Sequence, residues 1–218
     1  MNTINNDYSP HFVYLPKKEL EKKAIETNLN NKGKIKLSPL SGSEPFYNPD
    51  KWNLKKNIKH NHNCYSYAAD HFNPHRKGKP QPGYFSGYNH IQENEYECKN
   101  FYNRIQNDIP SSYLTSFEEP CKKGFHKAFM AIDDKPEDKD YHFFRQDSRG
   151  LWSHKPGRTE VQDVDASQKK IENPLTANRD YTHFAYKKPC FFFCLHPKLG
   201  RTHSAKVNNK KTIFSFDF

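Results

Sequence analysis

Long hydrophobic runs are missing from this sequence of 218 residues. Hydrophobic residues make up only 33% of the chain, the mean hydropathy is -1.10, and the longest apolar run lies near residues 190–195. No stretch approaches the length needed to cross a bilayer, and residues 1–16 lack the apolar centre of a secretory signal. We therefore expect a soluble, intracellular protein with no membrane span.

Paired cysteine motifs are also missing. The chain has five cysteines, an odd number, and no two of them form a Cys-x-x-Cys pair. No disulfide framework can be derived from such spacing, and a reducing compartment is the simpler expectation. The sequence indicates no cofactor.

Candidate metal ligands alternate in one stretch, His60-Asn61-His62-Asn63-Cys64. Further histidines and cysteines stand nearby or late in the chain: His71, His75, Cys190, Cys194 and His196. Alternating ligands suit a strand, whereas this stretch is typical of a loop that enters a helix, and zinc sites commonly use Cys-x-x-Cys pairs. Zinc binding therefore stays open only as a minor alternative.

Acidic residues are too few to balance the basic ones. The chain has 35 Lys and Arg against 25 Asp and Glu, a net charge of +10 and a pI of about 9.2. Such a charge favours acidic partners, nucleic acid among them, and Arg76, Lys77 and Lys79 form a small basic patch. The sequence contains no signature of a nucleic-acid-binding module. A genome whose proteins use lysine as their default polar residue would also explain the charge. Nucleic acid stays a possible partner by charge alone.

The order of sequence patterns predicts an α+β domain that follows a polar arm. Residues 1–44 are rich in Asn, Lys and Ser, with one helix expected at 17–27, and the domain is expected to span 45–218. Three aromatics between prolines in residues 45–53 predict an extended segment that docks on the core. Helices are expected from Cys64 and between 88 and 114, and strands over 125–132, 141–146, 151–155, 191–195 and 212–218.

Cys64 is the candidate nucleophile. Asn63 is a good N-cap, so Cys64 is expected in the first turn of a short helix, where the helix dipole favours a thiolate. The alternative is that Cys64 is one small buried residue among five cysteines.

Two histidines on a predicted hairpin could serve a thiol nucleophile, which needs a base and a group that orients the base. His142 lies on one strand and His154 on the next, with a tight turn at 147–150. A simple register places them on opposite faces, whereas a bulge, or one residue more or less in the turn, places them on the same face. The register stays open, and His126 is a second candidate base.

These residues resemble the NlpC/P60 branch of the papain-like cysteine peptidases. Cys64 matches the nucleophile, Pro82-Gly83 the turn that leads toward a strand, His142 the base and His154 the orienting residue. The resemblance implies a papain-like fold and a peptidase- or amidase-like hydrolase with a peptide or acyl substrate. The sequence departs from the family in three places. The family's Asp-Cys-Ser is Asn63-Cys64-Tyr65 here, Tyr84 stands where the family usually has Asp, and the insertion at 88–124 is long.

The stretches 63–68, 141–147 and 152–157 also resemble uncharacterised proteins of large DNA viruses. This resemblance implies a host-cell or virion location and contacts with other virion or capsid proteins through the N-terminal arm. The alternative function is therefore a virion structural protein, a minor capsid component, whose papain-like site is vestigial. Because Cys64, His142 and His154 are all present, the sequence favours the hydrolase.

Overall fold

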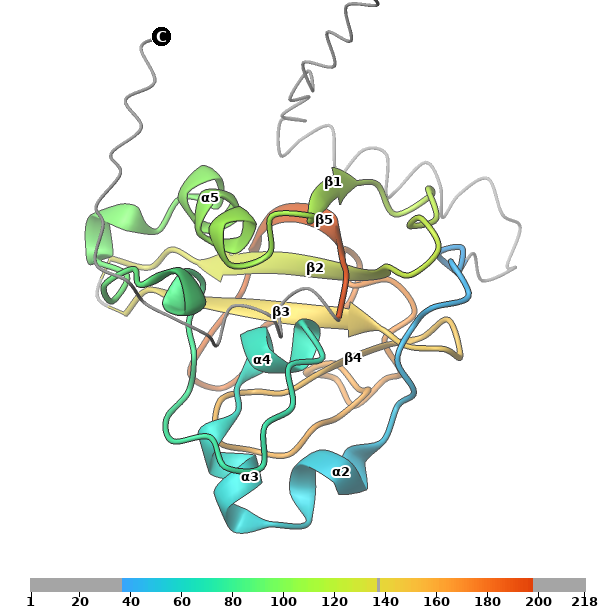
Figure 1. Cartoon of the computed structure of the whole chain (residues 1–218), viewed down its shortest axis with the longest axis horizontal. Coiled ribbons are helices and arrows are strands. Elements are labelled where there is room, and N and C mark those ends of the chain that lie inside the picture. The colour runs from blue at the N-terminus through green and yellow to red at the C-terminus, as the bar shows by residue number, and fades with distance from the viewer. Residues whose placement is uncertain (1–36, 137, 198–218) are drawn as a thin grey trace, which may run out of the picture. The chain divides into compact units, whose positions relative to one another are not determined.

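A five-stranded antiparallel sheet forms the centre of the described part of the chain (Figure 1). The computed structural model describes residues 37–136 and 138–197. In spatial order the strands are β1 (Tyr113–Thr115), β5 (Lys188–Leu195), β2 (His126–Asp133), β3 (Asp140–Gln146) and β4 (Trp152–His154). Each strand pairs antiparallel with its neighbours.

Short helices accompany this sheet, and the mixture confirms the predicted α+β class. The α-helices are α2 (Pro49–Asn53), α3 (Lys56–Asn61), α4 (Cys64–Ala68) and α5 (Cys98–Asp108), and the 3₁₀ helices are η1 (Tyr84–Ser86) and η2 (Glu93–Glu95). Figure 1 shows α4 and α5 against the sheet, with α2 and α3 below it. No helix of the described ranges is both long and apolar enough to cross a membrane.

The sheet has an apolar cluster on each face, because successive strand residues point to opposite sides. On what we call the helix face, Ala128, Met130 and Phe143 pack with residues of α4 and α5. On what we call the loop face, Phe129 and Phe144 pack with side chains from β4, β5, the segment between them and the connection before β2: Trp152, Phe192, Ile171, Tyr186 and Phe117. All eight residues of β2 are buried, as expected for a central strand covered on both sides.

The helix predicted at Cys64 is confirmed, and its start is capped as expected. The Asn63 side chain accepts a hydrogen bond from the Ser66 backbone N–H, and the Ser66 hydroxyl in turn accepts one from the Asn63 N–H. This reciprocal capping satisfies two backbone donors at the helix start. Every residue of α4 is buried, so packing stabilises a helix that is too short to be stable alone.

Several predicted elements have different bounds in the structure. The helical region predicted at 88–114 contains η2 and α5, and it runs at its end into the unpredicted strand β1. The segment predicted as extended at 45–53 contains α2, because Asn48 caps the helix, Pro49 suits its first position, and Trp52 is buried. The predicted helix at 17–27 and strand at 212–218 lie outside the described residues.

The structure contains two disulfides, which the cysteine spacing did not reveal and which a reducing compartment would not favour. Cys98 of α5 is bonded to Cys190, and Cys121 is bonded to Cys194, so both bridges end on β5. The paired residues are 92 and 73 positions apart, a separation at which sequence spacing carries no signal. Cys64 is the remaining free cysteine of the chain, and it is buried.

The described end of the predicted arm, residues 37–44, contacts the domain directly. The Ser38 hydroxyl donates to the Phe117 carbonyl at 2.6 Å and accepts from the buried Lys127 Nζ at 2.6 Å. The Ser41 hydroxyl donates to the Phe125 carbonyl at 2.6 Å. These contacts fix residues 37–44 beside the start of β2.

Candidate functional site

His142 and His154 meet on the loop face of the sheet. His142 Nε2 lies 2.7 Å from His154 Nδ1, and His154 Nε2 lies 3.0 Å from the Val164 carbonyl. A carbonyl can only accept, so His154 carries its proton on Nε2 and accepts at Nδ1 from the His142 Nε2–H. The structure therefore contains a directed chain of hydrogen bonds from His142 through His154 to Val164.

The register of the β3–β4 hairpin explains this meeting. Phe144 is directly opposite His154, so His142, two residues before Phe144, projects from the same face. The connection runs over 147–151, one residue longer than the predicted turn at 147–150. The option of one extra turn residue, left open by the sequence, is the one that the structure adopts.

Aromatic rings surround the histidine pair and remove it from solvent. Tyr186 stacks on His142 with ring centroids 4.8 Å apart, and Phe144 stacks on His154 at 5.0 Å. Burial lowers the pKa of His142 well below its ordinary value, with a further contribution from His154, and burial lowers the pKa of His154 to about 4. Both rings are therefore neutral at pH 7.

Sequence reasoning missed the partner that holds Tyr186 over this pair. The Tyr186 hydroxyl donates to the Asp140 carboxylate at 2.7 Å, which connects the end of the loop-face segment to the first residue of β3. No motif links these residues, because their proximity depends on the path of the chain across the sheet. The arrangement orders the loop-face segment and keeps the histidine rings buried.

Cys64 lies on the opposite side of β3, among the apolar residues of the helix face. Its side chain is buried, and the thiol donates a weak hydrogen bond to the Tyr141 carbonyl, with Sγ and O 3.9 Å apart. Burial raises the pKa of this thiol to about 12, and the charge of Asp140 adds to the shift. Since the helix dipole does not overcome this burial, Cys64 is a neutral thiol at pH 7.

The alternation of side chains along β3 separates the thiol from the histidine pair. Phe143 and Tyr141 pack with the Cys64 cluster, whereas His142 and Phe144 project toward the loop face. Within the described residues, the thiol makes hydrogen bonds with backbone groups and with no imidazole. The structure thus joins two of the three predicted site residues and places the third elsewhere.

His126, the second candidate base, supports the end of α4 instead. Its Nε2 donates to the Ala68 carbonyl at 2.7 Å, which satisfies a carbonyl at the helix C-terminus. Burial lowers the pKa of His126 to about 4, so this ring is also neutral. The Pro82-Gly83 turn does not lead into a strand either, because Gly83 directly precedes η1.

Three of the residues considered for zinc are engaged in other interactions. Cys190 and Cys194 are each half of a disulfide. His62 binds the Ile58 carbonyl through Nδ1 at 2.8 Å and the Asn73 N–H through Nε2 at 3.2 Å. Within residues 37–136 and 138–197, no group of three His, Cys, Asp or Glu side chains could hold a metal ion.

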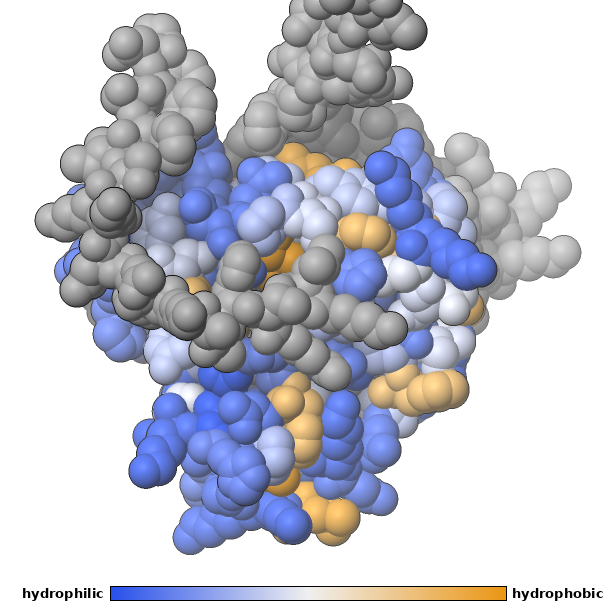
Figure 2. Space-filling view, in the orientation of Figure 1, coloured by the Kyte–Doolittle hydropathy of each residue, from blue (hydrophilic) through white to orange (hydrophobic). Residues whose placement is uncertain are grey.

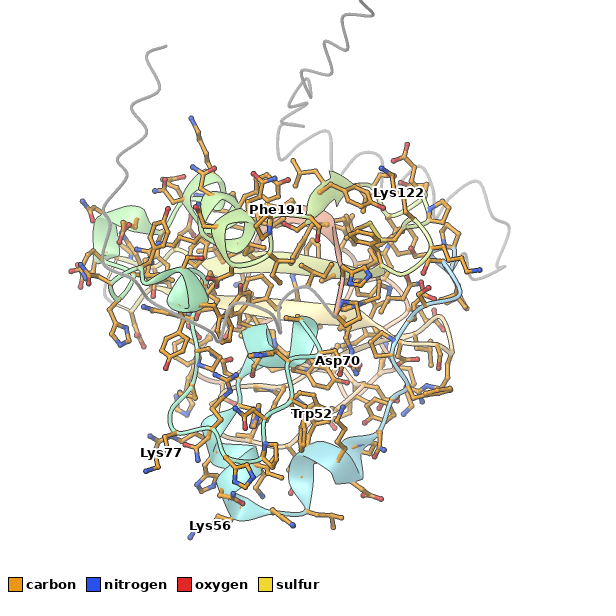
Figure 3. The ribbon with its side chains drawn as sticks, viewed as in Figure 1. Trp52, Lys56, Asp70, Lys77, Lys122 and Phe191 are labelled. Atoms are coloured by element: carbon orange, nitrogen blue, oxygen red, sulfur yellow. A yellow bond between two sulfur atoms is a disulfide. The ribbon has the colours of Figure 1, made fainter. Side chains whose placement is uncertain are left out.

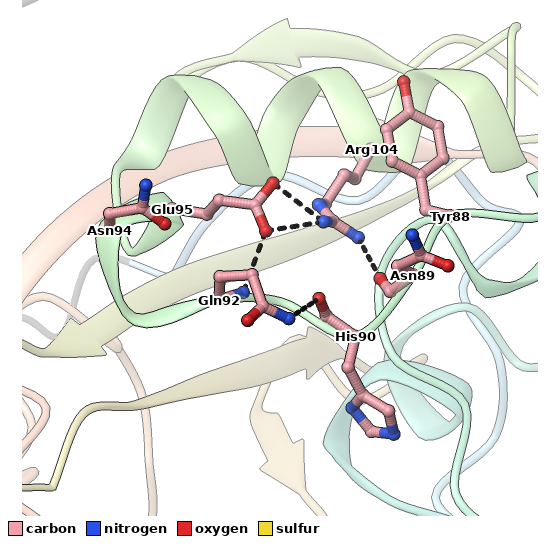
Figure 4. A pocket seen from close by; sticks show the side chains of 7 residues that line it. All are labelled: Tyr88, Asn89, His90, Gln92, Asn94, Glu95 and Arg104. Carbon is pink, nitrogen blue, oxygen red and sulfur yellow. Dashed lines mark hydrogen bonds and ion pairs between the residues drawn. The ribbon is translucent and has the colours of Figure 1, made fainter.

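A surface pocket of about 540 Å³ lies away from all three predicted site residues (Figure 4). Its lining comes from η2, α5 and the segment between η1 and η2: Tyr88, Asn89, His90, Gln92, Asn94, Glu95 and Arg104. Arg104 Nη2 donates to both carboxylate oxygens of Glu95, at 2.8 and 2.9 Å, and Arg104 Nη1 donates to the Asn89 carbonyl at 2.9 Å. These bonds satisfy the charges inside the pocket and hold η2 against α5.

Comparison with known proteins favours a structural role over the predicted hydrolase. The chain is 32% identical over 133 residues to insoluble matrix shell protein 1 from Ruditapes philippinarum, a match that covers 61% of this chain and 80% of that protein. This chain belongs to the insoluble matrix shell protein 1 family. No protein-family model and no solved structure matches it.

Membership of the insoluble matrix shell protein 1 family corrects the predicted function. The named member is, by its name, a protein of an insoluble shell matrix. The prediction of a cysteine hydrolase with a peptide or acyl substrate is therefore wrong. The geometry agrees, because a neutral, buried thiol without an imidazole partner lacks the activation that a cysteine nucleophile needs.

Proposed function

We propose that this protein is a non-catalytic structural component of an insoluble matrix. The observation that carries the proposal is the relationship to insoluble matrix shell protein 1, which extends over 80% of that protein. A match of this extent includes most of the relative and is not limited to one motif. The proposal keeps the structural part of the alternative function from the sequence, and the viral attribution stays a prediction.

The former candidate site fits a structural role. On the helix face, Cys64 fills space in the core beside α4 and α5. On the loop face, the bond between His142 and His154 joins two strands, and the bond from His154 to Val164 ties the following segment to them. Buried polar groups that are fully hydrogen-bonded specify one arrangement of the chain.

The two disulfides support a location in an oxidising compartment, in place of the intracellular location expected from the sequence. Disulfides persist outside the cell or in secretory compartments and are rare in the reducing cytosol. Both bridges hold β5, one to α5 and the other to the segment before β2. Such cross-links suit a protein that must stay folded in an extracellular matrix.

We also propose that the domain has a papain-like outline that serves as a scaffold. In support, α4 begins at a cysteine and packs against the antiparallel strand β3 of the sheet. On β3, Phe143 packs with the Cys64 cluster near the position expected for the base. The adjacent His142 points to the opposite face of the sheet. In this scaffold the thiol position has become part of the core.

Fractionation of the source organism tests the matrix proposal. An antibody to the protein would follow it through extraction with salt, then with detergent, and then with detergent plus a reducing agent. We expect most of the protein in the extracellular, salt-insoluble residue, and equal retention of the Cys64→Ser variant. Recovery of the protein as a soluble cytosolic species would contradict the proposal.

A further inference from the structure

One end of the domain concentrates positive charge from three separate segments of the chain. Its cations, which we call the basic end, come from α3, from the loop 73–80 and from the turn after β4: Lys56, Lys59, Lys77, Lys79 and Arg158. Figure 3 shows Lys56 and Lys77 extending from the same end of the domain, and Figure 2 shows a mainly hydrophilic surface there with some hydrophobic side chains among the hydrophilic ones.

Backbone contacts hold these three segments together. The Gly78 N–H donates to the Asn61 side chain at 3.0 Å, which places the loop 73–80 against the end of α3. The buried Lys155 Nζ donates to the carbonyls of Lys59, Gly157 and Thr159, at 2.7, 2.9 and 2.8 Å. The cluster of charges is therefore a built feature of the fold.

The positive charge of the basic end is mostly uncompensated. Glu160 pairs with Lys59 at 3.3 Å, and the other four cations make no ion pair with any described residue. The pKa of His60 reflects this excess of positive charge. Desolvation lowers the pKa, and so do the nearby charges of four residues: Lys56, Lys59, Arg158 and Lys155. An anion bound at this end would relieve that repulsion.

The surroundings of the basic end favour a carboxylate chain over nucleic acid. Four of its five cations are lysines, whose ammonium groups pair with carboxylates and phosphates alike, so the charges by themselves do not choose between these anions. The rings beside α3 offer no free face for base stacking, because Phe72 stacks on His62 and Lys51 lies over the Phe72 ring. A flexible chain of carboxylates needs no stacking face.

We propose that the basic end binds an acidic polypeptide segment of a neighbouring matrix protein. This inference rests on the proposed matrix function and names the kind of partner that the domain holds there. The lysines would pair with successive Asp or Glu side chains, and the attraction would weaken as salt screens the charges.

Binding of fluorescein-labelled poly-aspartate to the full-length protein, followed by anisotropy at low salt, tests the proposal. The variant Lys56→Gln/Lys77→Gln/Lys79→Gln removes three charges from the basic end. The control Lys122→Gln/Lys123→Gln/Lys169→Gln removes three charges elsewhere, and Figure 3 shows Lys122 far from Lys56 in the view. We expect the first variant to raise Kd about tenfold and the control to change it less than twofold.

A second readout follows the charge at His60. Poly-aspartate should raise the His60 pKa toward its ordinary value in an NMR titration of the full-length protein, and the basic-end variant should lose this response. Equal loss of affinity in both triple variants, or an unchanged His60 pKa, would overturn the proposal. Tighter binding of single-stranded DNA than of poly-aspartate would overturn it in favour of nucleic acid.

The outcomes also separate this inference from the matrix function. A protein that stays in the insoluble residue and does not bind poly-aspartate retains the matrix role and refutes the acidic partner. A basic-end variant that lowers self-association in sedimentation, with poly-aspartate affinity unchanged, would instead assign the basic end to a second copy of this chain and refute the proposal.

Discussion

His142 donates a hydrogen bond to His154 on the loop face of the sheet, and the Cys64 thiol lies on the other face of the same strand. The hydrogen-bonded histidines have the separation of a catalytic base and its orienting residue, 2.7 Å between ring nitrogens. Their rings are packed between aromatic side chains, and neither is hydrogen-bonded to the thiol within the described part of the chain. The pair joins elements of the fold and does not activate the thiol.

The disulfides should account for a large part of the stability. Each bridge closes a long loop, and removal of such a bridge costs about 4 kcal/mol in the chain-entropy description. We expect Cys98→Ala/Cys190→Ala to lower the free energy of unfolding in urea by about that amount. Peptide mapping without reduction should recover Cys98 with Cys190 and Cys121 with Cys194. A different pairing would contradict the structure of β5.

The buried histidines should make the protein sensitive to acid. His126 and His154 have folded-state pKa values of about 4, below the ordinary value of 6.5. The unfolded chain therefore binds protons first, so stability is complete above pH 6.5 and is lost as pH falls toward 4, by about 3 kcal/mol for each histidine. Burial raises the pKa of Asp108 and of Asp140, which offsets part of this loss.

Urea unfolding at pH 7.5, 6 and 5 would measure this acid effect. We expect the midpoint to fall at each step, and the fall to become steeper below pH 6. A midpoint that stays constant from pH 7.5 to pH 5 would show that these imidazoles are protonated in the folded protein and exposed to solvent.

Lys155 should be a structural residue of unusual importance for a lysine. Its buried side chain donates through Nζ to three partly buried backbone carbonyls, and Lys155→Met would remove all three hydrogen bonds. We expect a loss of about 3–5 kcal/mol in the free energy of unfolding. The exposed Lys169→Met is the control, with an expected change within about 0.5 kcal/mol. A loss below about 1 kcal/mol for Lys155→Met would contradict the described geometry.

Local patterns in the sequence predicted the elements that depend on neighbouring residues. The Asn63 cap and the apolar runs of β2, β3 and β5 are signals of this kind, and the structure contains all of them. The short strand β1 escaped prediction, because Tyr113–Thr115 forms a strand only through its pairing with β5. The disulfides escaped for the same reason, since residues far apart in the sequence meet only in the folded chain.

The candidate site shows where sequence reasoning stops. The spacing of His142 and His154 identified two residues that do meet, and one extra turn residue placed them on a common face. Which face of β3 would receive α4 depended on the whole pattern of core packing, because Phe143 and His142 are adjacent and point opposite ways. The spacing of residues along the chain cannot show which face of β3 packs against α4. That packing determines whether the Cys64 thiol meets an imidazole.

Thiol reactivity of the intact protein tests the central claim most directly. Cys64 is the one cysteine outside the disulfides, so alkylation with iodoacetamide at pH 8 reports on it alone. With a thiol pKa of about 12, we expect labelling roughly a thousandfold slower than for a free cysteine, and a normal rate once the protein is unfolded in guanidinium. Fast labelling of the folded protein, slowed by His142→Gln, would contradict the structural account.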